Sequence, residues 1–151
     1  MQRYSVLLVD DEEEVIQIIM KKLDWASMGF RIAGYAHNGA EALELAEECQ
    51  PDVVMTDIKM PYMDGLELSR RLKERYPSIR IIIFSGFDEF EYAKEAIRIE
   101  VEEYILKPND AGELQELFGR IRKSLDKEID EKRNIDKLQE YYMESLPLLQ
   151  E

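Results

Sequence analysis

The segment that decides the fold is Pro51-Asp52-Val53-Val54-Met55-Thr56-Asp57, a short apolar run that ends at a carboxylate. A second, nearly continuous apolar run occupies residues 79–84. Runs of this kind are typical of parallel strands that are covered on both faces of a sheet. The two runs therefore predict the central strands of an α/β fold.

The same alternation of an apolar run with a helical pattern continues on both sides of this segment. Strands are expected at 4–9, 30–36, 53–56, 79–84 and 104–106, and helices at 15–23, 40–48, 66–75, 90–99 and 114–125. Because crossovers between parallel strands are right-handed, this order predicts a doubly wound α/β fold with a five-stranded parallel sheet and five helices.

The domain organisation follows from length and from a change in composition near the C-terminus. A chain of 151 residues has the length of one compact domain with a short extension. We expect residues 1–125 to form the domain, and the charge-rich residues 126–151 to form a helical linker or C-terminal extension toward an absent output domain. An obligate coiled coil is the less favoured alternative, because heptad spacing places three polar side chains on its seam: Glu128, Lys132 and Gln139.

The composition narrows the possible ligands and partners. With 33 acidic and 20 basic side chains, the net charge of −13 repels nucleic acid and anionic lipid surfaces. One cysteine and one histidine cannot form the usual zinc cage, so any metal must bind to oxygen ligands. The apolar segment near the N-terminus is too short for a signal sequence or a membrane span, which predicts a cytoplasmic protein without membrane attachment.

Polar side chains follow four of the five predicted strands. Asp10 and Asp11 come after the first strand, Asp57 after the third, Ser85 after the fourth and Lys107 after the fifth. Parallel strands end at one edge of the sheet, where ligands of such folds bind. These side chains are therefore expected to form one site.

The residue types of this site favour phosphoryl chemistry with Mg²⁺ as cofactor. Three adjacent carboxylates repel one another unless a cation binds, and Mg²⁺ takes oxygen ligands from few carboxylates. Lys107 and Ser85 suit the oxygens of a phosphoryl group. Asp57 is the best nucleophile candidate, because it stands alone after a central strand, and its attack would give an aspartyl phosphate.

Each motif also has a simpler interpretation when it is taken alone. Asp10 and Asp11 could only cap the following helix, Ser85 could be a turn residue, and Lys107 could mark an ordinary strand end. Their common position at one sheet edge favours the functional interpretation. His37 is expected to be a loop residue without a carboxylate partner.

Four segments resemble the receiver domain of two-component response regulators, the family that includes the single-domain chemotaxis regulator. These segments are 6–12, 51–65, 83–86 and 104–108, and the resemblance spans residues 4–125. It implies a flavodoxin-like fold with strand order 2-1-3-4-5. Residues 24–25 and 85–97 further resemble regulators whose output is an AraC-type helix-turn-helix domain, which is not in this chain. Glu100 departs from the family, which commonly has glycine there.

The resemblance also implies the roles of individual residues at the metal site. Asp10 and Asp11 would be the acidic pair, with Asp11 the more direct ligand of Mg²⁺. Asp57 would be the phosphoacceptor and a further metal ligand. The backbone carbonyl of Lys59 would complete the protein's share of the metal shell.

Two further roles concern how the phosphoryl group is recognised. Ser85 and Lys107 would contact the group, and Tyr104 would change rotamer when Ser85 moves toward it. The output face would then consist of the fourth helix, the fifth strand and the fifth helix.

The resulting hypothesis is a switch rather than an enzyme with a substrate of its own. A sensor histidine kinase would donate the phosphoryl group to Asp57, and phosphorylation would promote a homodimer and change an output, most simply transcription. A Mg²⁺-dependent aspartyl-phosphate hydrolase is the alternative, although Lys59 stands where such enzymes place a second aspartate as general acid. A degenerate receiver that acts as a constitutive interaction module is the third possibility.

Overall fold

The computed structural model describes residues 3–86, 90–107 and 110–149, and it describes the last five of them by their backbone only. The chain forms two compact units, Met1–Gln115 and Glu116–Glu151. Parts of the resemblance segments, at 87–89 and at Pro108, lie outside the described residues. The expected division between a domain of residues 1–125 and an extension of residues 126–151 stays a prediction.

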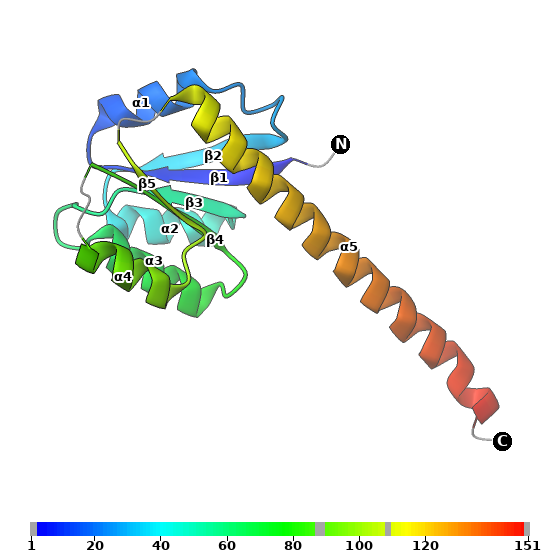
Figure 1. Ribbon diagram of the computed structural model, residues 1–151. Coiled ribbons are helices and arrows are strands. Elements are labelled where there is room, and N and C mark those ends of the chain that lie inside the picture. The colour runs from blue at the N-terminus through cyan, green and yellow to red at the C-terminus, as the bar shows by residue number, and fades with distance from the viewer. Residues whose placement is uncertain (1–2, 87–89, 108–109, 150–151) are drawn as a thin grey trace. The chain divides into compact units, whose positions relative to one another are not determined.

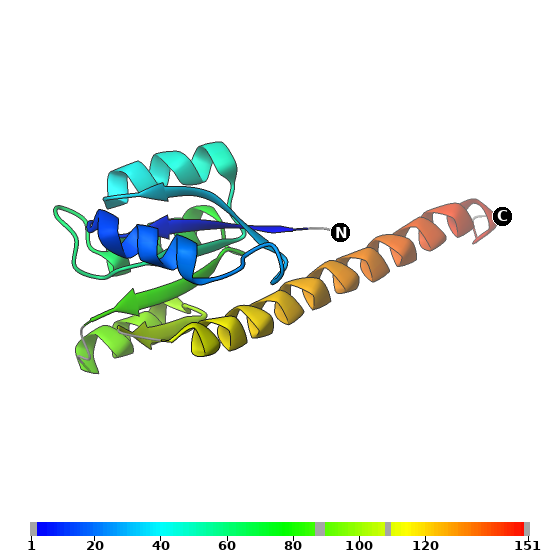
Figure 2. The same cartoon turned by 90° about the horizontal axis from the view of Figure 1, so that it is seen from above.

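The first unit contains a single parallel sheet of five strands in the order β2-β1-β3-β4-β5. The strands are β1 (Tyr4–Val9), β2 (Phe30–Ala36), β3 (Val53–Thr56), β4 (Arg80–Ser85) and β5 (Glu103–Leu106). Their arrowheads point to the same edge of the sheet (Figure 2). The flavodoxin-like fold and its strand order are confirmed.

Helices connect successive strands and cover both faces of the sheet, and a last helix follows β5. They are α1 (Glu13–Lys22), α2 (Gly39–Cys49), α3 (Gly65–Arg75), α4 (Phe90–Ile99) and α5 (Ala111–Leu149). Helix α1 lies on one face, and α2, α3 and α4 lie on the other (Figure 1). This layering explains why β3 and β4 lack an alternation of polar and apolar residues, since both faces of these strands are buried.

The hydrophobic core beneath α2, α3 and α4 explains why the central strands are so apolar. Side chains from β1, β3 and β4 meet helix residues there, and all are buried: Leu7, Val9, Val54, Ile81, Ile83, Ala42, Ala46, Leu68 and Leu72. Tyr104 of β5 packs against this cluster and is half-buried.

The expected bounds of two strands are wrong by a single residue: β5 begins at Glu103 instead of residue 104, and β4 is shifted at both ends. Strand β4 runs from Arg80 to Ser85 rather than over 79–84. Ile79 instead closes a turn, because its backbone N–H donates to the carbonyl of Tyr76 at 3.0 Å. Ser85 is therefore the last residue of the strand, where it pairs with Leu106, and does not follow it.

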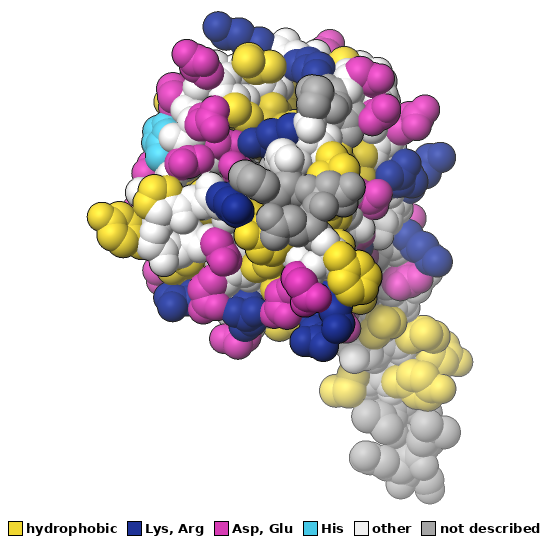
Figure 3. Space-filling model, turned by 60° about the vertical axis from the view of Figure 1, so that its left-hand side comes forward, with side chains coloured by type: hydrophobic (Ala, Val, Ile, Leu, Met, Phe, Trp, Pro, Cys, Tyr) yellow, Lys and Arg dark blue, Asp and Glu magenta, His cyan; other side chains and the backbone are white. Residues whose placement is uncertain are grey.

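The second unit is helical, since α5 runs without a break as far as Leu149. Several large hydrophobic side chains of this unit are exposed to solvent (Figure 3): Ile135, Leu138, Tyr141, Tyr142 and Met143. No helix of the described residues is both long enough and apolar enough to cross a membrane.

Candidate functional site

The sheet register brings the acidic residues of β1 and β3 together. Val9 pairs with Thr56 as the last residues of the two strands. The next backbone N–H, that of Asp57, donates to the carbonyl of Val9 at 3.0 Å. Asp10 and Asp57 therefore leave the sheet side by side at its carboxyl edge.

Three aspartates form one acidic cluster at this edge. Asp10 and Asp57 are buried, with 4% and 7% of their surface exposed, whereas Asp11 is exposed. One carboxylate oxygen of each residue lies within 4.8 Å of the others. This is an oxygen-rich donor set of the kind that hard divalent cations prefer.

Lys107 directly follows β5, the outermost strand of the sheet, and its side chain reaches the acidic cluster. Its backbone N–H extends the β4–β5 ladder by donating to the carbonyl of Ser85 at 2.7 Å. Its ammonium lies 2.8 Å from Oδ2 of Asp10 and 3.4 Å from Oδ2 of Asp57. One cation is thus shared between two buried carboxylates.

This sharing leaves negative charge uncompensated. Burial is the main reason that the pKa of Asp57 is raised; the charge of Lys107 lowers it, the charge of Asp10 raises it by less, and the net direction is upward. Burial lowers the pKa of Lys107, but the hydrogen bond and charge of Asp10, together with Asp57, outweigh burial and raise its pKa overall. The lysine is therefore firmly charged, while Asp57 lacks a full counter-charge of its own.

The loop after β3 fixes the orientation of the Asp57 carboxylate. Oδ1 of Asp57 accepts a hydrogen bond from the backbone N–H of Ile58 at 2.7 Å, and its main-chain carbonyl accepts one from the hydroxyl of Thr56 at 2.9 Å. The backbone N–H of Gly65 returns to the carbonyl of Ile58 at 2.7 Å. Asp64 then caps α3 by accepting from Glu67 N–H at 2.8 Å.

Asp10 also supports the start of α1, as its simpler interpretation anticipated. Its Oδ1 accepts from the backbone N–H of Glu12 at 2.9 Å, and Glu12 itself makes no side-chain capping bond. Oδ2 of Asp10 is nevertheless the atom that contacts Lys107. The two oxygens of one carboxylate thus hold the helix start and the lysine.

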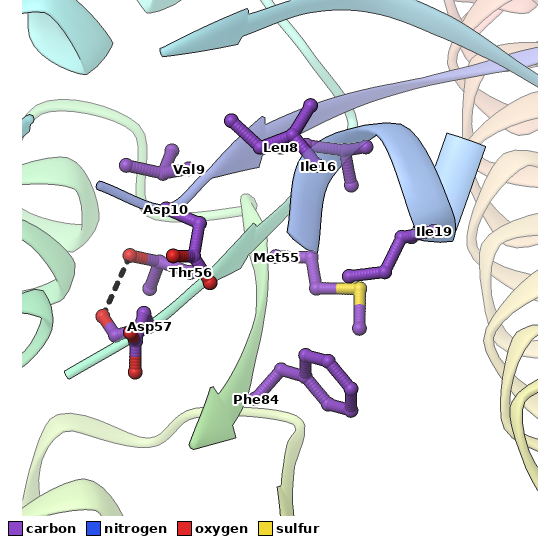
Figure 4. A pocket seen from close by; sticks show the side chains of 9 residues that line it. All are labelled: Leu8, Val9, Asp10, Ile16, Ile19, Met55, Thr56, Asp57 and Phe84. Atoms are coloured by element: carbon purple, nitrogen blue, oxygen red, sulfur yellow. Dashed lines mark hydrogen bonds between the residues drawn. The ribbon is translucent and has the colours of Figure 1, made fainter. Parts of the chain in front are cut away.

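A small, narrow pocket lies behind the acidic cluster (Figure 4). Its volume is about 10 Å³, close to the least that one water molecule needs. Its walls are mostly apolar and come from β1, α1, β3 and β4: Leu8, Val9, Asp10, Ile16, Ile19, Met55, Thr56, Asp57 and Phe84. The site is therefore backed by tightly packed apolar side chains.

Other predicted site residues occupy distinct positions around the cluster. Ser85 is fully buried at the end of β4. The side chain of Lys59 lies outside the cluster, exposed, with its ammonium 5.9 Å from the ring centre of Tyr92. Tyr104 lies on β5, where it pairs with Ile83. Their assigned roles stay predictions.

Two contacts at the site were missed by the sequence interpretation. The ammonium of Lys107 lies 5.4 Å from the ring centre of Phe84. A Cβ atom at Gly65 would overlap the backbone carbonyl oxygen of Asp57. Strand alternation could have revealed the first contact, whereas the second depends on the path of the loop after β3.

His37 was also misjudged, because it does have carboxylate partners. Its Nε2 contacts Glu13 at the start of α1, and its Nδ1 lies 3.8 Å from Glu41 of α2. The hydrogen bond to Glu13 is the main reason that the pKa of His37 is raised. Glu13 lies 24 residues away in the chain, so local sequence could not reveal this contact.

Comparison with known proteins identifies the class to which this fold and site belong. Residues 6–118 match the response regulator receiver domain family. The chain belongs to that family, whose members are receiver domains of two-component response regulators.

Individual relatives agree with this assignment. The chain is 47% identical over 105 residues to YesN of Bacillus subtilis, an uncharacterized transcriptional regulatory protein, with 70% of this chain and 28% of YesN covered. It is 34% identical over 122 residues to the transcriptional regulatory protein HptR of Staphylococcus aureus, with 81% of this chain and 48% of HptR covered. The chain therefore spans less than half the length of either relative.

A solved structure gives the same result at the level of the fold. The receiver domain of AraT, a response regulator from Geobacillus stearothermophilus, is 39% identical and superposes with a TM-score of 0.78. The match covers 83% of this chain and 97% of that chain.

Proposed function

We propose that the chain is a phosphorylation switch in which Asp57 accepts a phosphoryl group from a sensor histidine kinase. The observation that carries the proposal is the position of the Asp57 carboxylate. It is buried, oriented by Ile58 N–H, and placed 3.4 Å from the ammonium of Lys107. Membership of the receiver family supports the same role.

Mg²⁺ is the proposed cofactor, and the donor set fits it. Asp10, Asp11 and Asp57 bring three carboxylates together, and Lys107 supplies one positive charge, so a divalent cation would neutralise the remainder. Mg²⁺ binds through few carboxylates and keeps several waters, which suits a cluster with one exposed member. The carbonyl of Lys59 is proposed as a further ligand. Bound there, Mg²⁺ would neutralise charge on the oxygens of the transferring group.

In the transfer, an oxygen of the Asp57 carboxylate forms a bond to phosphorus. The bond between phosphorus and the donor's histidine nitrogen breaks, and its electron pair stays on that nitrogen. The nucleophile is the ionised carboxylate, which carries no proton to be removed, so no separate general base is needed. Lys107 lies where it can stabilise the charge on the transferring oxygens, since such reactions depend mainly on positioning and electrostatics.

The switch would be read through Ser85 and Tyr104. The phosphoryl group adds a charge of about −1.5 to −2 beside Asp57. The hydroxyl of Ser85 would donate to one of its oxygens, and Tyr104 would change rotamer in response. Helix α4, strand β5 and helix α5 would then present the altered output face.

The wider assignment follows from the regulators that this chain resembles. We propose that the output is transcription, delivered by an AraC-type domain outside this chain, and that the chain itself binds neither nucleic acid nor membrane and works in the cytoplasm. It would catalyse phosphotransfer to its own Asp57 alone. Phosphorylation would favour a homodimer, to which the exposed Ile135, Leu138 and Tyr142 could contribute apolar surface.

Labelling by a small phosphodonor tests the proposal. Acetyl phosphate with Mg²⁺ should add one phosphoryl group to the intact protein, as measured by mass spectrometry. Asp57→Asn should abolish the addition while circular dichroism shows an unchanged fold. Asp64→Asn is the matched control, because asparagine caps a helix as well as aspartate does, and it should be labelled like the wild type.

Two outcomes would reject the proposal. Undiminished labelling of Asp57→Asn would place the acceptor elsewhere. Steady turnover of a small phosphate ester, in place of one slowly lost phosphoryl group, would instead favour the Mg²⁺-dependent hydrolase.

A further inference from the structure

The contact between Phe84 and Lys107 is an aromatic contact at the acidic cluster. The ammonium of Lys107 lies 5.4 Å from the centre of the Phe84 ring, within the range of a cation–π interaction. The same ammonium lies 2.8 Å from Asp10 and 3.4 Å from Asp57. In one position, the ammonium of Lys107 therefore contacts two carboxylates and an aromatic ring.

Strand pairing explains why these two side chains meet. Phe84 pairs with Ile105 in the parallel β4–β5 ladder, so their side chains lie on the same face of the sheet. Lys107 lies two residues beyond Ile105, and the ladder continues through its bond to Ser85. The alternation of side chains therefore puts Lys107 on the face that Phe84 occupies.

The ring of Phe84 is held in place by its surroundings. Only 8% of Phe84 is exposed. Phe84 lines the small pocket behind the acidic cluster with Ile16, Ile19 and Met55 (Figure 4). A ring packed among such side chains is a fixed surface, whereas the stem of Lys107 has four carbons and many rotamers.

We infer that Phe84 is a positioning residue for Lys107: its ring face holds the ammonium beside Asp57 for phosphoryl transfer. This inference rests on the proposed function. Lys107 is 20% exposed, so its ammonium can turn away toward water. When a cation binds the carboxylates, their attraction for Lys107 weakens, but the attraction of the ring does not depend on them.

The sharpest test varies the electron density of the ring with little change in its shape. Phenylalanines with one, two and three ring fluorines are placed at position 84 of the full chain, and the rate of labelling by acetyl phosphate is measured at saturating Mg²⁺. Fluorines withdraw electrons and weaken a cation–π contact. The rate should fall stepwise, by about two- to tenfold over the series.

A fluorinated ring at position 30 is the matched control. Phe30 is fully buried and lies against the ring of Tyr4, with 5.9 Å between the ring centres. Fluorination there changes a core ring without touching the site, so the labelling rate should not follow the number of fluorines.

A second measurement reports the contact without phosphorylation. The ring current of Phe84 should shift the proton resonances of the Lys107 Cε group upfield, and Phe84→Leu should remove this shift. A rate that is flat or rises across the series, with the wild type labelled normally, overturns the positioning role but leaves the proposed function intact. An unshifted Lys107 resonance in the wild type overturns it as well. A wild type that cannot be labelled rejects both.

Discussion

The backbone of Gly65 approaches the main chain of Asp57 so closely that no side chain fits between them. A Cβ atom at Gly65 would overlap the carbonyl oxygen of Asp57 and lie 2.8 Å from its carbonyl carbon. Gly65 cannot simply retreat, because its N–H donates to the carbonyl of Ile58 at 2.7 Å. The start of α3 is thus pressed against the proposed phosphoacceptor.

Gly65→Ala should therefore destabilise the protein and disturb the site. We expect a loss of about 2–3 kcal/mol in the free energy of unfolding, from the forced backbone shift. Labelling of Asp57 by acetyl phosphate should also slow, because the carboxylate moves with its backbone. Urea unfolding and labelling rates measure the two effects.

Gly119→Ala is the control for this substitution. Gly119 lies inside α5, where alanine is the better helix former by about 1 kcal/mol. This variant should be at least as stable as the wild type and be labelled at the normal rate. Equal stability of the Gly65 and Gly119 variants would contradict the close approach at Asp57.

Asp57→Asn should stabilise the metal-free protein at neutral pH. Burial raises the pKa of Asp57 above its ordinary value, so ionisation of this carboxyl costs more free energy in the folded state than in the unfolded state. Stability from this group is present below the ordinary pKa and is lost as pH rises through the folded pKa. The melting temperature of the variant in EDTA should exceed that of the wild type at pH 7, and the gap should close as the pH falls toward 3.8.

Mg²⁺ should reverse this order of stability. A ligand that binds only the folded state stabilises it, by about 1.4 kcal/mol at ten times its dissociation constant. The melting temperature of the wild type should rise with Mg²⁺, whereas Asp57→Asn, with one carboxylate fewer, should respond much less. An equal rise in both proteins would argue against Asp57 as a metal ligand.

The pKa of His37 should depend on Glu13. The hydrogen bond to Glu13 raises this pKa, burial opposes the rise, and Glu41 adds a smaller contribution. Because the chain contains one histidine, a single proton resonance in an NMR titration reports its pKa. Glu13→Gln should return the pKa toward its ordinary value, and Glu41→Gln should lower it less.

The same contact predicts a small effect of pH on stability. A histidine with a raised pKa stabilises the fold fully below its unfolded pKa, and this stabilisation is lost as pH rises through the folded pKa. His37→Gln should flatten the fall in melting temperature over that range, from about pH 6.5 upward. An unchanged slope would mean that the His37–Glu13 contact does not form in solution.

The fold could be predicted from sequence because its signals are local. The bounds expected for three strands, 4–9, 30–36 and 53–56, agree with the structure, and so do those of helix 90–99. Each of these segments has a period or an apolar run that needs no information about distant residues. The bounds of β4 were missed by one residue because the turn bond between Ile79 and Tyr76 takes one apolar residue out of the strand.

The grouping of the site could be predicted for a related reason, since parallel strands end at a common edge. That rule brings Asp10, Asp57 and Lys107 together, as the structure shows. It does not state which oxygen contacts which donor or how close α3 comes at Gly65. Those details depend on loop paths and side-chain packing, which the periodicity of the sequence does not predict.

Glu100 offers a last test, because it ends α4 in a conformation that favours glycine. The φ angle of Glu100 is 66°. Its N–H donates to the carbonyl of Ile97, and the N–H of Val101 donates to the carbonyl of Ala96. These are the two hydrogen bonds of a Schellman motif. Glu100→Gly should raise the free energy of unfolding by about 0.5–1 kcal/mol in urea unfolding. Glu100→Ala removes the same charge but keeps the Cβ atom, so its free energy of unfolding should rise less. If both variants gained equally, charge repulsion rather than backbone strain would be the cause.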